Sequence, residues 1–161
     1  MVPLDPLMRV MASLRGAKGC PWDKEQTHHT LRRYLIEECY EVIEAIDENN
    51  MHKLVEELGD LLLQVVFHAR LAEETGSFDM NDVIAGVVAK MVRRHPHVFG
   101  DIKVKDSDEV LINWAAIKKQ EKEGNGEALG VLGGIPIELP ALLRAYKIQG
   151  RAARVGFDWP N

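Results

Sequence analysis

The chain has 161 residues, of which 46% are hydrophobic and 28% charged, and its 20 basic and 25 acidic residues give a net charge of −5. This length suits one compact domain with a sizeable core, and the acidic balance argues against a protein that mainly coats nucleic acid. No apolar run reaches the roughly 18 residues of a membrane-spanning helix, and a signal peptide is not apparent, so we expect a soluble, cytoplasmic protein. Cys20 and Cys39 have neither disulfide-scaffold nor zinc-site spacing.

Apolar residues recur three and four positions apart along most of the chain, and the alternation typical of strands is absent. This pattern predicts an all-α protein. Capping residues and glycine or proline stops set the ends of the helices. The helices expected in chain order span about residues 1–15, 27–47, 52–74, 79–95, 106–123 and 140–154, with a turn-rich break at 16–23.

A glycine-rich segment interrupts the helical pattern near the C-terminus. Five of the eleven residues from 124 to 134 are glycine, a composition that favours a flexible loop over a helix. We therefore expect a helical domain at 1–123, a glycine-rich flexible loop at 124–136, and a C-terminal helix and tail at 137–161.

Two acidic residues lie where the first long helix should present apolar side chains. On a helical projection of residues 31–48, Glu38 falls between Leu31 and Ala45, and Glu41 lies one turn further on the same edge. Glu37 projects to the polar side instead. A carboxylate inside an apolar arc is costly unless it is paired or bound to a metal, so Glu38 and Glu41 are candidate metal ligands.

The next helix carries a narrow polar stripe with apolar residues on both sides. The stripe consists of Lys53, Glu57, Asp60, Gln64 and His68. Every residue from 61 to 67 except Gln64 is apolar, so we expect the helix centre to be covered on nearly all sides. If the two helices pack antiparallel, their acids meet in one pocket. Carboxylate ligands favour Mg²⁺ or Mn²⁺ over zinc, and the Glu-x-x-His motif of di-iron bundles is missing from both acid pairs.

The motif Glu37-Glu38-x-x-Glu41 followed by Glu57-Leu58-Gly59-Asp60 resembles the signature of the MazG family, which consists of nucleoside triphosphate pyrophosphohydrolases. Other blocks resemble that family in the same order, namely Gly19-Cys20-Pro21-Trp22-Asp23, Gln26-Thr27-His28, residues 58–68 and residues 93–100. The resemblance covers roughly residues 8–120. It implies an antiparallel helical bundle of the all-α NTP pyrophosphatase type.

The resemblance also implies an activity, which is hydrolysis of a nucleoside triphosphate to a monophosphate and pyrophosphate by water attacking the α-phosphate. It implies that the catalytic acids and Mg²⁺ ligands are Glu38, Glu41, Glu57 and Asp60. Glu37 would bind a further ion or orient the water, and is included with the catalytic residues. The substrate-binding residues that it implies are Lys53, Lys90, Arg94, Trp114 and Lys118. The residues alone leave two of these roles open, because Lys90 and Arg94 could complement a helix dipole and Trp114 could be a core aromatic.

Helices that are apolar on nearly all sides need more packing partners than one such subunit supplies. We therefore expect a homodimer or higher homo-oligomer whose core is completed by dimerisation. The expected small-molecule partner is an NTP or dNTP substrate. We expect the protein to bind neither a membrane nor a nucleic acid polymer. Two alternatives stay open, a catalytically weak domain that serves dimerisation or regulation, and a relative restricted to dUTP or phosphoribosyl-ATP. Many MazG proteins carry two such domains in tandem, and the sequence leaves open whether this chain is part of one.

Overall fold

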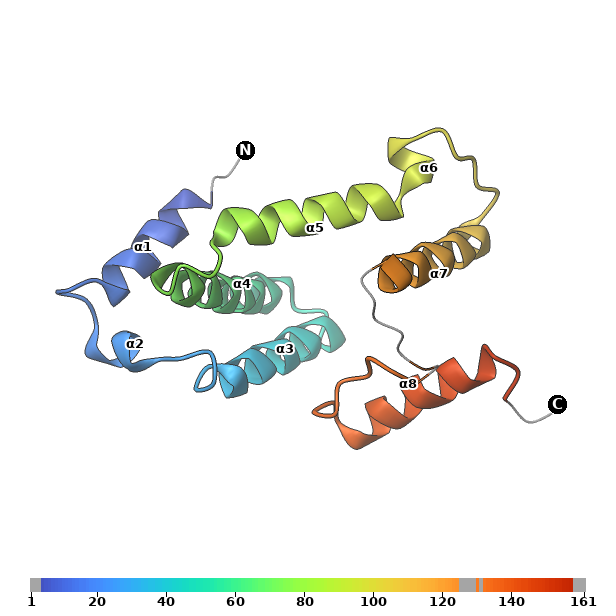
Figure 1. Cartoon of the computed structure of the whole chain (residues 1–161). Coiled ribbons are helices and arrows are strands. Elements are labelled where there is room, and N and C mark those ends of the chain that lie inside the picture. The colour runs from blue at the N-terminus through green and yellow to red at the C-terminus, as the bar shows by residue number, and fades with distance from the viewer. Residues whose placement is uncertain (1–3, 125–129, 131, 158–161) are drawn as a thin grey trace. The chain divides into compact units, whose positions relative to one another are not determined.

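The computed structural model describes residues 4–124, 130 and 132–157. All regular secondary structure in these residues is helical, as the sequence predicts. The helices are α1 (Asp5–Arg15), α2 (Pro21–Glu25), α3 (Arg32–Asp47), α4 (Met51–Glu74), α5 (Met80–Arg94), α6 (Pro96–Phe99), α7 (Ser107–Gly124) and α8 (Ala141–Ala153) (Figure 1). The chain divides into two compact units, Met1–Met91 and Val92–Asn161, which are described separately.

The ends of the longer helices follow from local capping chemistry. The side chain of Asn50 accepts a hydrogen bond from the backbone nitrogen of Lys53 at 3.1 Å and so caps the start of α4. The chain leaves α4 through Gly76, whose φ of 68° suits glycine. Asp106 caps α7 in the same way, because its Oδ1 accepts from the backbone nitrogen of Glu109 at 3.0 Å. These ends confirm the predicted ones to within a few residues.

Two short helices were not predicted. α2 lies in the expected break and α6 follows the expected end of α5, and each begins with a proline at its first position. Proline suits that position because its missing N–H would have no helical partner there. Helices of five and four residues are too short to show a hydrophobic period. The longer helix predicted from residue 27 begins instead at Arg32, since residues 27–31 form a turn closed by Thr27 and Thr30.

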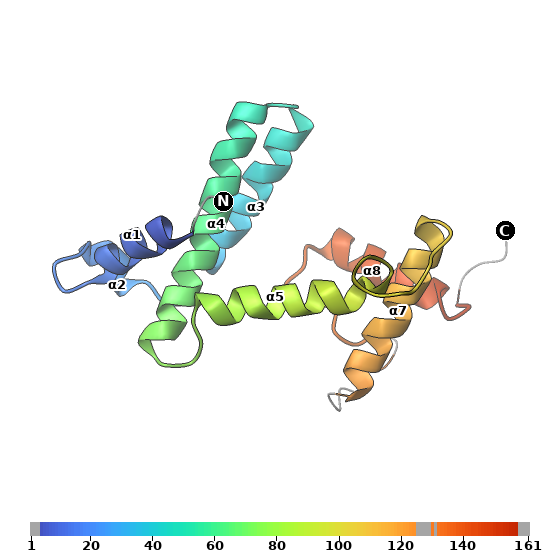
Figure 2. The same ribbon diagram turned by 90° about the horizontal axis from the view of Figure 1, so that it is seen from above.

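The first unit is built on the hairpin of α3 and α4, which lie side by side and antiparallel, with α1 packed across α4 (Figures 1 and 2). Its buried core consists of Met11, Leu31, Val66, Phe67, Ala69, Leu71 and Met80. The core therefore lies where α1 and the C-terminal half of α4 meet. The other end of the hairpin carries the acidic residues.

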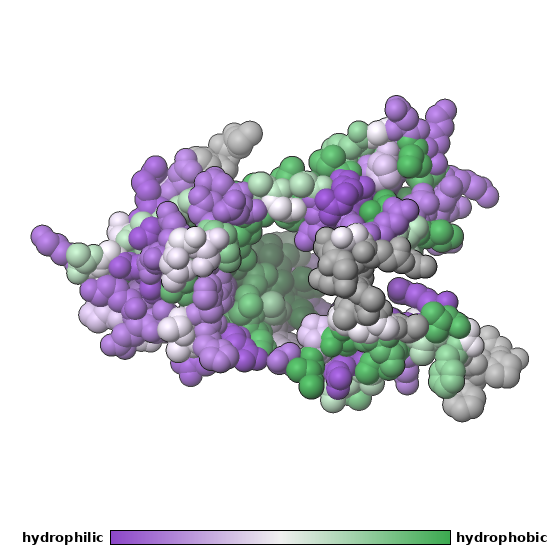
Figure 3. Space-filling model, viewed as in Figure 1, coloured by the Kyte–Doolittle hydropathy of each residue, from purple (hydrophilic) through white to green (hydrophobic). Residues whose placement is uncertain are grey.

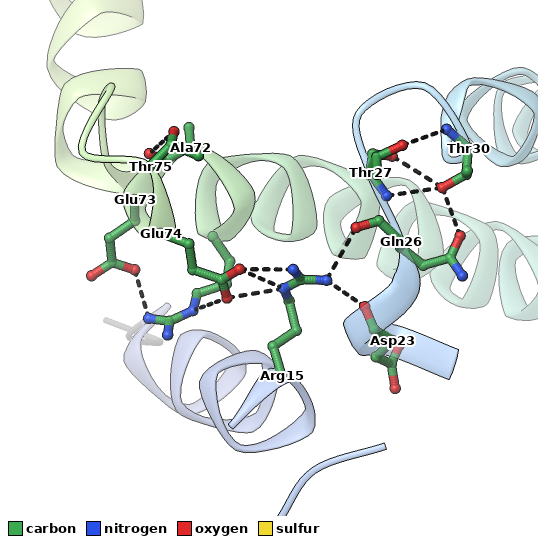
Figure 4. A network of polar contacts seen from close by, with 10 residues as sticks. Arg15, Asp23, Gln26, Thr27, Thr30, Ala72, Glu73, Glu74 and Thr75 are labelled. Carbon is green, nitrogen blue, oxygen red and sulfur yellow. Dashed lines mark hydrogen bonds and ion pairs between the residues drawn. The ribbon is translucent and has the colours of Figure 1, made fainter. Parts of the chain in front are cut away.

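Arg15 links three helices of this unit (Figure 4). Its side chain is only 7% exposed and donates to the Glu74 carboxylate, with Nη2 2.7 Å from Oε2. The same guanidinium donates to the backbone carbonyls of Asp23 and Gln26 and lies 5.5 Å from the centroid of the Phe67 ring. The segment that leads into α3 is thereby held against α4, which fixes the base of the hairpin.

The expectation that the centre of α4 is covered on nearly all sides is wrong for the single chain. Val55 is 75% exposed, Leu58 48%, Leu62 41% and Val65 37%. Cys39 is exposed as well, on α3. Hydrophobic residues are visible on the surface of both units in Figure 3. Among the described helices, none combines the length and the apolar character needed to cross a bilayer.

The second unit contains the end of α5 and helices α6 to α8. Arg93 and Arg94, at the C-terminal end of α5, form ion pairs with Glu121 of α7, and Arg151 of α8 donates to the carbonyl oxygen of Gly133. Part of the expected loop at 124–136 and the tail at 158–161 lie outside the described residues. The domain limits at 123 and 136 stay predictions.

Candidate metal and phosphate sites

Three carboxylates gather on the α3–α4 hairpin. One oxygen from each of Glu38, Glu41 and Glu57 lies within 4.8 Å of the others. Glu38 and Glu41 share a face of α3 because residues three apart are neighbours on a helix, and the antiparallel packing of α4 brings Glu57 opposite them. Glu38 and Glu57 are half-buried and Glu41 is exposed. The cluster is thus open to solvent on one side.

Asp60, the fourth predicted acid, lies one turn after Glu57 and is half-buried. It is not one of the three mutually close carboxylates, but its charge reaches them. The pKa of Glu38 is raised above its ordinary value, first by burial and then by the negative charges of Asp60 and Glu41. All four acids therefore share one electrostatic environment.

The pKa of Glu57 is raised above its ordinary value for the same reasons. Burial raises its pKa most, the charges of Glu41, Glu56 and Asp60 raise it further, and the nearby Lys53 ammonium lowers it. Carboxylates that repel one another at this separation are stabilised by a hard divalent cation, which prefers oxygen ligands. The donor set of Glu38, Glu41 and Glu57 consists of carboxylates alone. These residues therefore fit a magnesium-like ion.

Glu37 does not belong to the group of three mutually close carboxylates. Its side chain is exposed, and its charge acts on Arg33, one turn back along α3. The solvent-side position matches the helical projection, and a part for Glu37 in the chemistry stays a prediction.

Lys53 lies one turn before Glu57 on α4, on the acidic side of the hairpin. Its ammonium nitrogen is 2.5 Å from Oε2 of Glu44 and 3.7 Å from Oε2 of Glu48, both on the C-terminal part of α3 and its cap. The hydrogen bond to Glu44 raises the pKa of Lys53. A substrate that uses this ammonium must share it with two acids.

The polar stripe on α4 continues beyond Asp60 through Gln64 and His68. Gln64 is 7% exposed, and its Oε1 is buried without a hydrogen-bond partner among the described residues. Nδ1 of His68 lies 2.7 Å from Nδ1 of His28, and the two rings are parallel. Burial, and then the charge of His28, lower the pKa of His68. The sequence gives no sign of this pair, because its members are 40 residues apart.

Three of the predicted substrate-binding residues, Arg94, Trp114 and Lys118, lie in the second unit. Trp114 and Lys118 are one turn apart on α7, with the Lys118 ammonium 5.5 Å from the centroid of the Trp114 ring. His95 packs edge-on against the same ring at 4.8 Å, and Trp114 is half-buried. Arg94 reaches this helix through Glu121. Lys90, half-buried on α5, belongs to the first unit with Lys53.

Two features of this second cluster suit an anionic ligand. The Trp114 indole Nε1 is buried and lacks a hydrogen-bond partner within the described part of the chain, although a buried indole N–H normally has one. The Lys118 ammonium lies over this ring, and Arg94 directly precedes His95, which packs against the ring. An acceptor oxygen placed here would satisfy the indole and meet positive charge. The core-aromatic interpretation of Trp114 leaves the indole N–H unexplained.

Comparisons with known proteins identify a family and several relatives. The family described as MazG nucleotide pyrophosphohydrolase domain matches residues 26–99, which include the four acids. A crystal structure of a MazG-related protein from Thermotoga maritima aligns with a TM-score of 0.60 and 32% identity, over 71% of this chain and 98% of that chain.

Three curated proteins are similar over most of this sequence. A nucleoside triphosphate pyrophosphohydrolase of Escherichia coli is 50% identical over 99% of the chain and 60% of its own length. The nucleoside triphosphate pyrophosphohydrolase/pyrophosphatase MazG of Thermotoga maritima is 50% identical over 98% of the chain and 59% of its own length. An uncharacterized Bacillus subtilis protein, YabN, is 55% identical over 87% of the chain and 28% of its own length. The chain thus spans at most about three fifths of these relatives.

Proposed function

Because the chain belongs to the MazG family, we propose that it hydrolyses nucleoside triphosphates to the monophosphate and pyrophosphate, with water attacking the α-phosphate. The observation that carries this proposal is the cluster of Glu38, Glu41 and Glu57 on the α3–α4 hairpin. Two relatives that match nearly the whole chain are named for this reaction. A carboxylate cluster with raised pKa values suits metal-assisted phosphoryl chemistry.

We propose that Mg²⁺, or Mn²⁺ in its place, binds to Glu38, Glu41, Glu57 and Asp60. When bound, such an ion supplies charge to polarise the α-phosphate, acidify a water molecule and stabilise the leaving pyrophosphate. The residues contribute position and electrostatics. Glu38 and Glu57 are held by their half-buried places in the hairpin, whereas Glu41 is exposed and accessible to substrate. Glu37, one residue before Glu38, is proposed to orient the attacking water or bind a further ion.

The proposed substrate-binding residues are Lys53, Lys90, Arg94, Trp114 and Lys118. The clearest support comes from the second unit, where a buried indole N–H without a partner lies beside the Lys118 ammonium. Arginine and lysine bind phosphate oxygens by charge-assisted hydrogen bonds, and an aromatic ring can stack on a base. Lys53 and Lys90 lie in the first unit and are proposed as substrate-binding cations there.

We also propose that two copies of the chain pair through the exposed apolar residues of α3 and α4. Val55, Leu58 and Leu62 are more exposed than leucine and valine usually are in a helical hairpin. A second hairpin packed on this face would remove them from water and form the isologous interface usual for homodimers. The cytoplasmic location stays a prediction.

Product identification tests the proposed reaction. The chain is incubated with each common NTP and dNTP, including dUTP, and Mg²⁺ in ¹⁸O-labelled water, and the products are separated by ion exchange and analysed by mass spectrometry. Monophosphate carrying the label, together with unlabelled pyrophosphate, is expected. Diphosphate and inorganic phosphate would contradict the proposal. Activity confined to dUTP would favour the narrow-substrate alternative, and Mg²⁺ binding without turnover would favour the catalytically weak domain.

A matched pair of variants excludes a contaminating hydrolase in that assay. Glu41→Gln removes a carboxylate of the cluster, and Glu25→Gln removes an exposed carboxylate on α2. Both variants lose one negative charge, so a contaminating hydrolase should separate from each of them in the same way during purification. Loss of label transfer in Glu41→Gln alone assigns the activity to this chain.

A further inference from the structure

Glu121 of α7 bridges two arginines at the end of α5. Its Oε1 accepts from Nε of Arg93 at 2.7 Å. Its Oε2 accepts from Nη2 of Arg94 at 2.6 Å and from Nε of Arg94 at 3.2 Å. The two nitrogens on one edge of the Arg94 guanidinium therefore meet a single carboxylate, which is the fork geometry that arginine also uses for phosphate.

Glu121 stands on the same face of α7 as two proposed substrate-binding residues. It lies three residues after Lys118 and seven after Trp114, so the three side chains share one side of the helix. Among the described residues, this acid pairs with two cations, and an indole N–H that lacks an acceptor lies two turns earlier on the same face of the helix. The charge balance of the cluster favours a more highly charged anion than one carboxylate.

We propose that Glu121 is an internal competitor for substrate phosphate, whose carboxylate occupies the Arg93 and Arg94 donors until a phosphate group of the nucleotide or of pyrophosphate displaces it. This inference rests on the proposed function, because it takes the arginine cluster to be where those phosphates bind. A phosphate group of a triphosphate or of pyrophosphate offers more negative charge than a carboxylate. Polyphosphates can therefore displace Glu121 and bind to the arginines, whereas ligands that carry less charge compete poorly with the carboxylate.

The exposure of the ion pairs makes such an exchange physically accessible. The side chains of Arg93, Arg94 and Glu121 are 53%, 22% and 18% exposed. These groups are only partly buried, so an incoming anion can reach the arginines from solvent. The two guanidinium groups hold the pKa of Glu121 at about 2. The carboxylate therefore stays charged well below neutral pH, so its protonation does not release the arginines under physiological conditions.

Calorimetric titration with inorganic pyrophosphate, without metal, tests the inference on the full chain. Glu121→Gln should bind pyrophosphate roughly two- to fivefold more tightly than wild type, because one partly exposed carboxylate no longer competes for the arginines. Asp108→Asn is the matched control, since it removes the same charge from an exposed residue about 140° around α7. Equal or weaker binding by Glu121→Gln would overturn the inference and assign Glu121 the structural role of holding Arg94.

A second measurement needs no substitution and so does not depend on how a variant folds. In wild type, the ¹³Cδ resonance of Glu121 should move towards that of an unpaired carboxylate as pyrophosphate is added. An unchanged resonance at saturation would contradict displacement. NTP hydrolysis by wild type is measured in parallel. Turnover with an unchanged Glu121 resonance would contradict only this inference. A shifted resonance without turnover would contradict only the proposed function.

Discussion

Lys53 and Glu44 form a close ion pair at 2.5 Å where the α3–α4 hairpin turns. A phosphate group that binds Lys53 would therefore compete with Glu44, because α3 already supplies a partner for the ammonium. The same ammonium lowers the pKa of Glu57, one turn further along α4. The positive charge of Lys53 thus acts both on Glu44 at the turn of the hairpin and on Glu57 in the carboxylate cluster.

Removing that charge should strengthen cation binding at the cluster. Lys53→Met is expected to bind Mg²⁺ roughly two- to fivefold more tightly, because a nearby positive charge no longer opposes the ion. Isothermal titration with Mg²⁺ measures the change, and Lys18→Met, which removes an exposed lysine beyond α1, serves as the control. Weaker Mg²⁺ binding by Lys53→Met would mean that the lysine instead holds the acids in place.

Mg²⁺ should stabilise the fold more at alkaline than at acidic pH. The raised pKa values of Glu38 and Glu57 contribute stability below the ordinary value of 4.5, and that contribution is lost as pH rises through the raised values. A bound cation relieves the repulsion that then appears. The increase in Tm on adding Mg²⁺ should be larger at about pH 8 than at about pH 5, as measured by scanning calorimetry. Equal increases at both pH values would refute this account.

Single substitutions in the cluster should abolish turnover and spare the fold. Glu41→Gln and Asp60→Asn each keep the size of the side chain and remove one negative charge, so each should lower kcat/KM by at least about 100-fold. Circular dichroism and Tm should stay close to wild type, because Glu41 is exposed and Asp60 only half-buried. Unchanged activity in either variant would exclude that residue from the metal site.

Arg15→Met should destabilise the first unit by about 1–3 kcal/mol, since it removes the more buried of two arginine donors to the Glu74 carboxylate and a donor to the carbonyls of Asp23 and Gln26. Urea unfolding measures this loss. Arg70→Met removes a more exposed partner of Glu74 and should cost below about 1 kcal/mol. Arg15 lowers the pKa of Glu74, so its contribution is present above pH 4.5 and fades as the pH falls through the lowered value. A cost no greater than that of Arg70→Met would contradict the structural role of Arg15.

A charge on the exposed face of α4 should prevent self-association. Wild type is expected to have twice the mass of the chain in size-exclusion chromatography with light scattering, and Val55→Glu or Leu58→Glu should give the monomer. Val98→Glu alters a valine of the second unit whose exposure, 62%, lies between those of Leu58 and Val55, and should leave the mass unchanged. A monomeric wild type at micromolar concentration would rule out the dimer.

Local patterns were enough to predict the longer helices and the spacing of the acids. The positions of Glu38 and Glu41 on one face follow from helical periodicity, and the ends of α4 follow from Asn50 and Gly76. The short helices α2 and α6 were missed because four or five residues hold no period.

By itself, the sequence determined the helical class and which acids share a helix face, because both depend on interactions between residues a turn apart. Only the tertiary structure decided the partners of the basic residues. Lys53 is paired with Glu44 nine residues away, and Arg94 with Glu121 twenty-seven residues away. Pairings over such separations depend on how helices pack, and the same packing left Val55 and Leu58 exposed on a helix whose composition suggests burial.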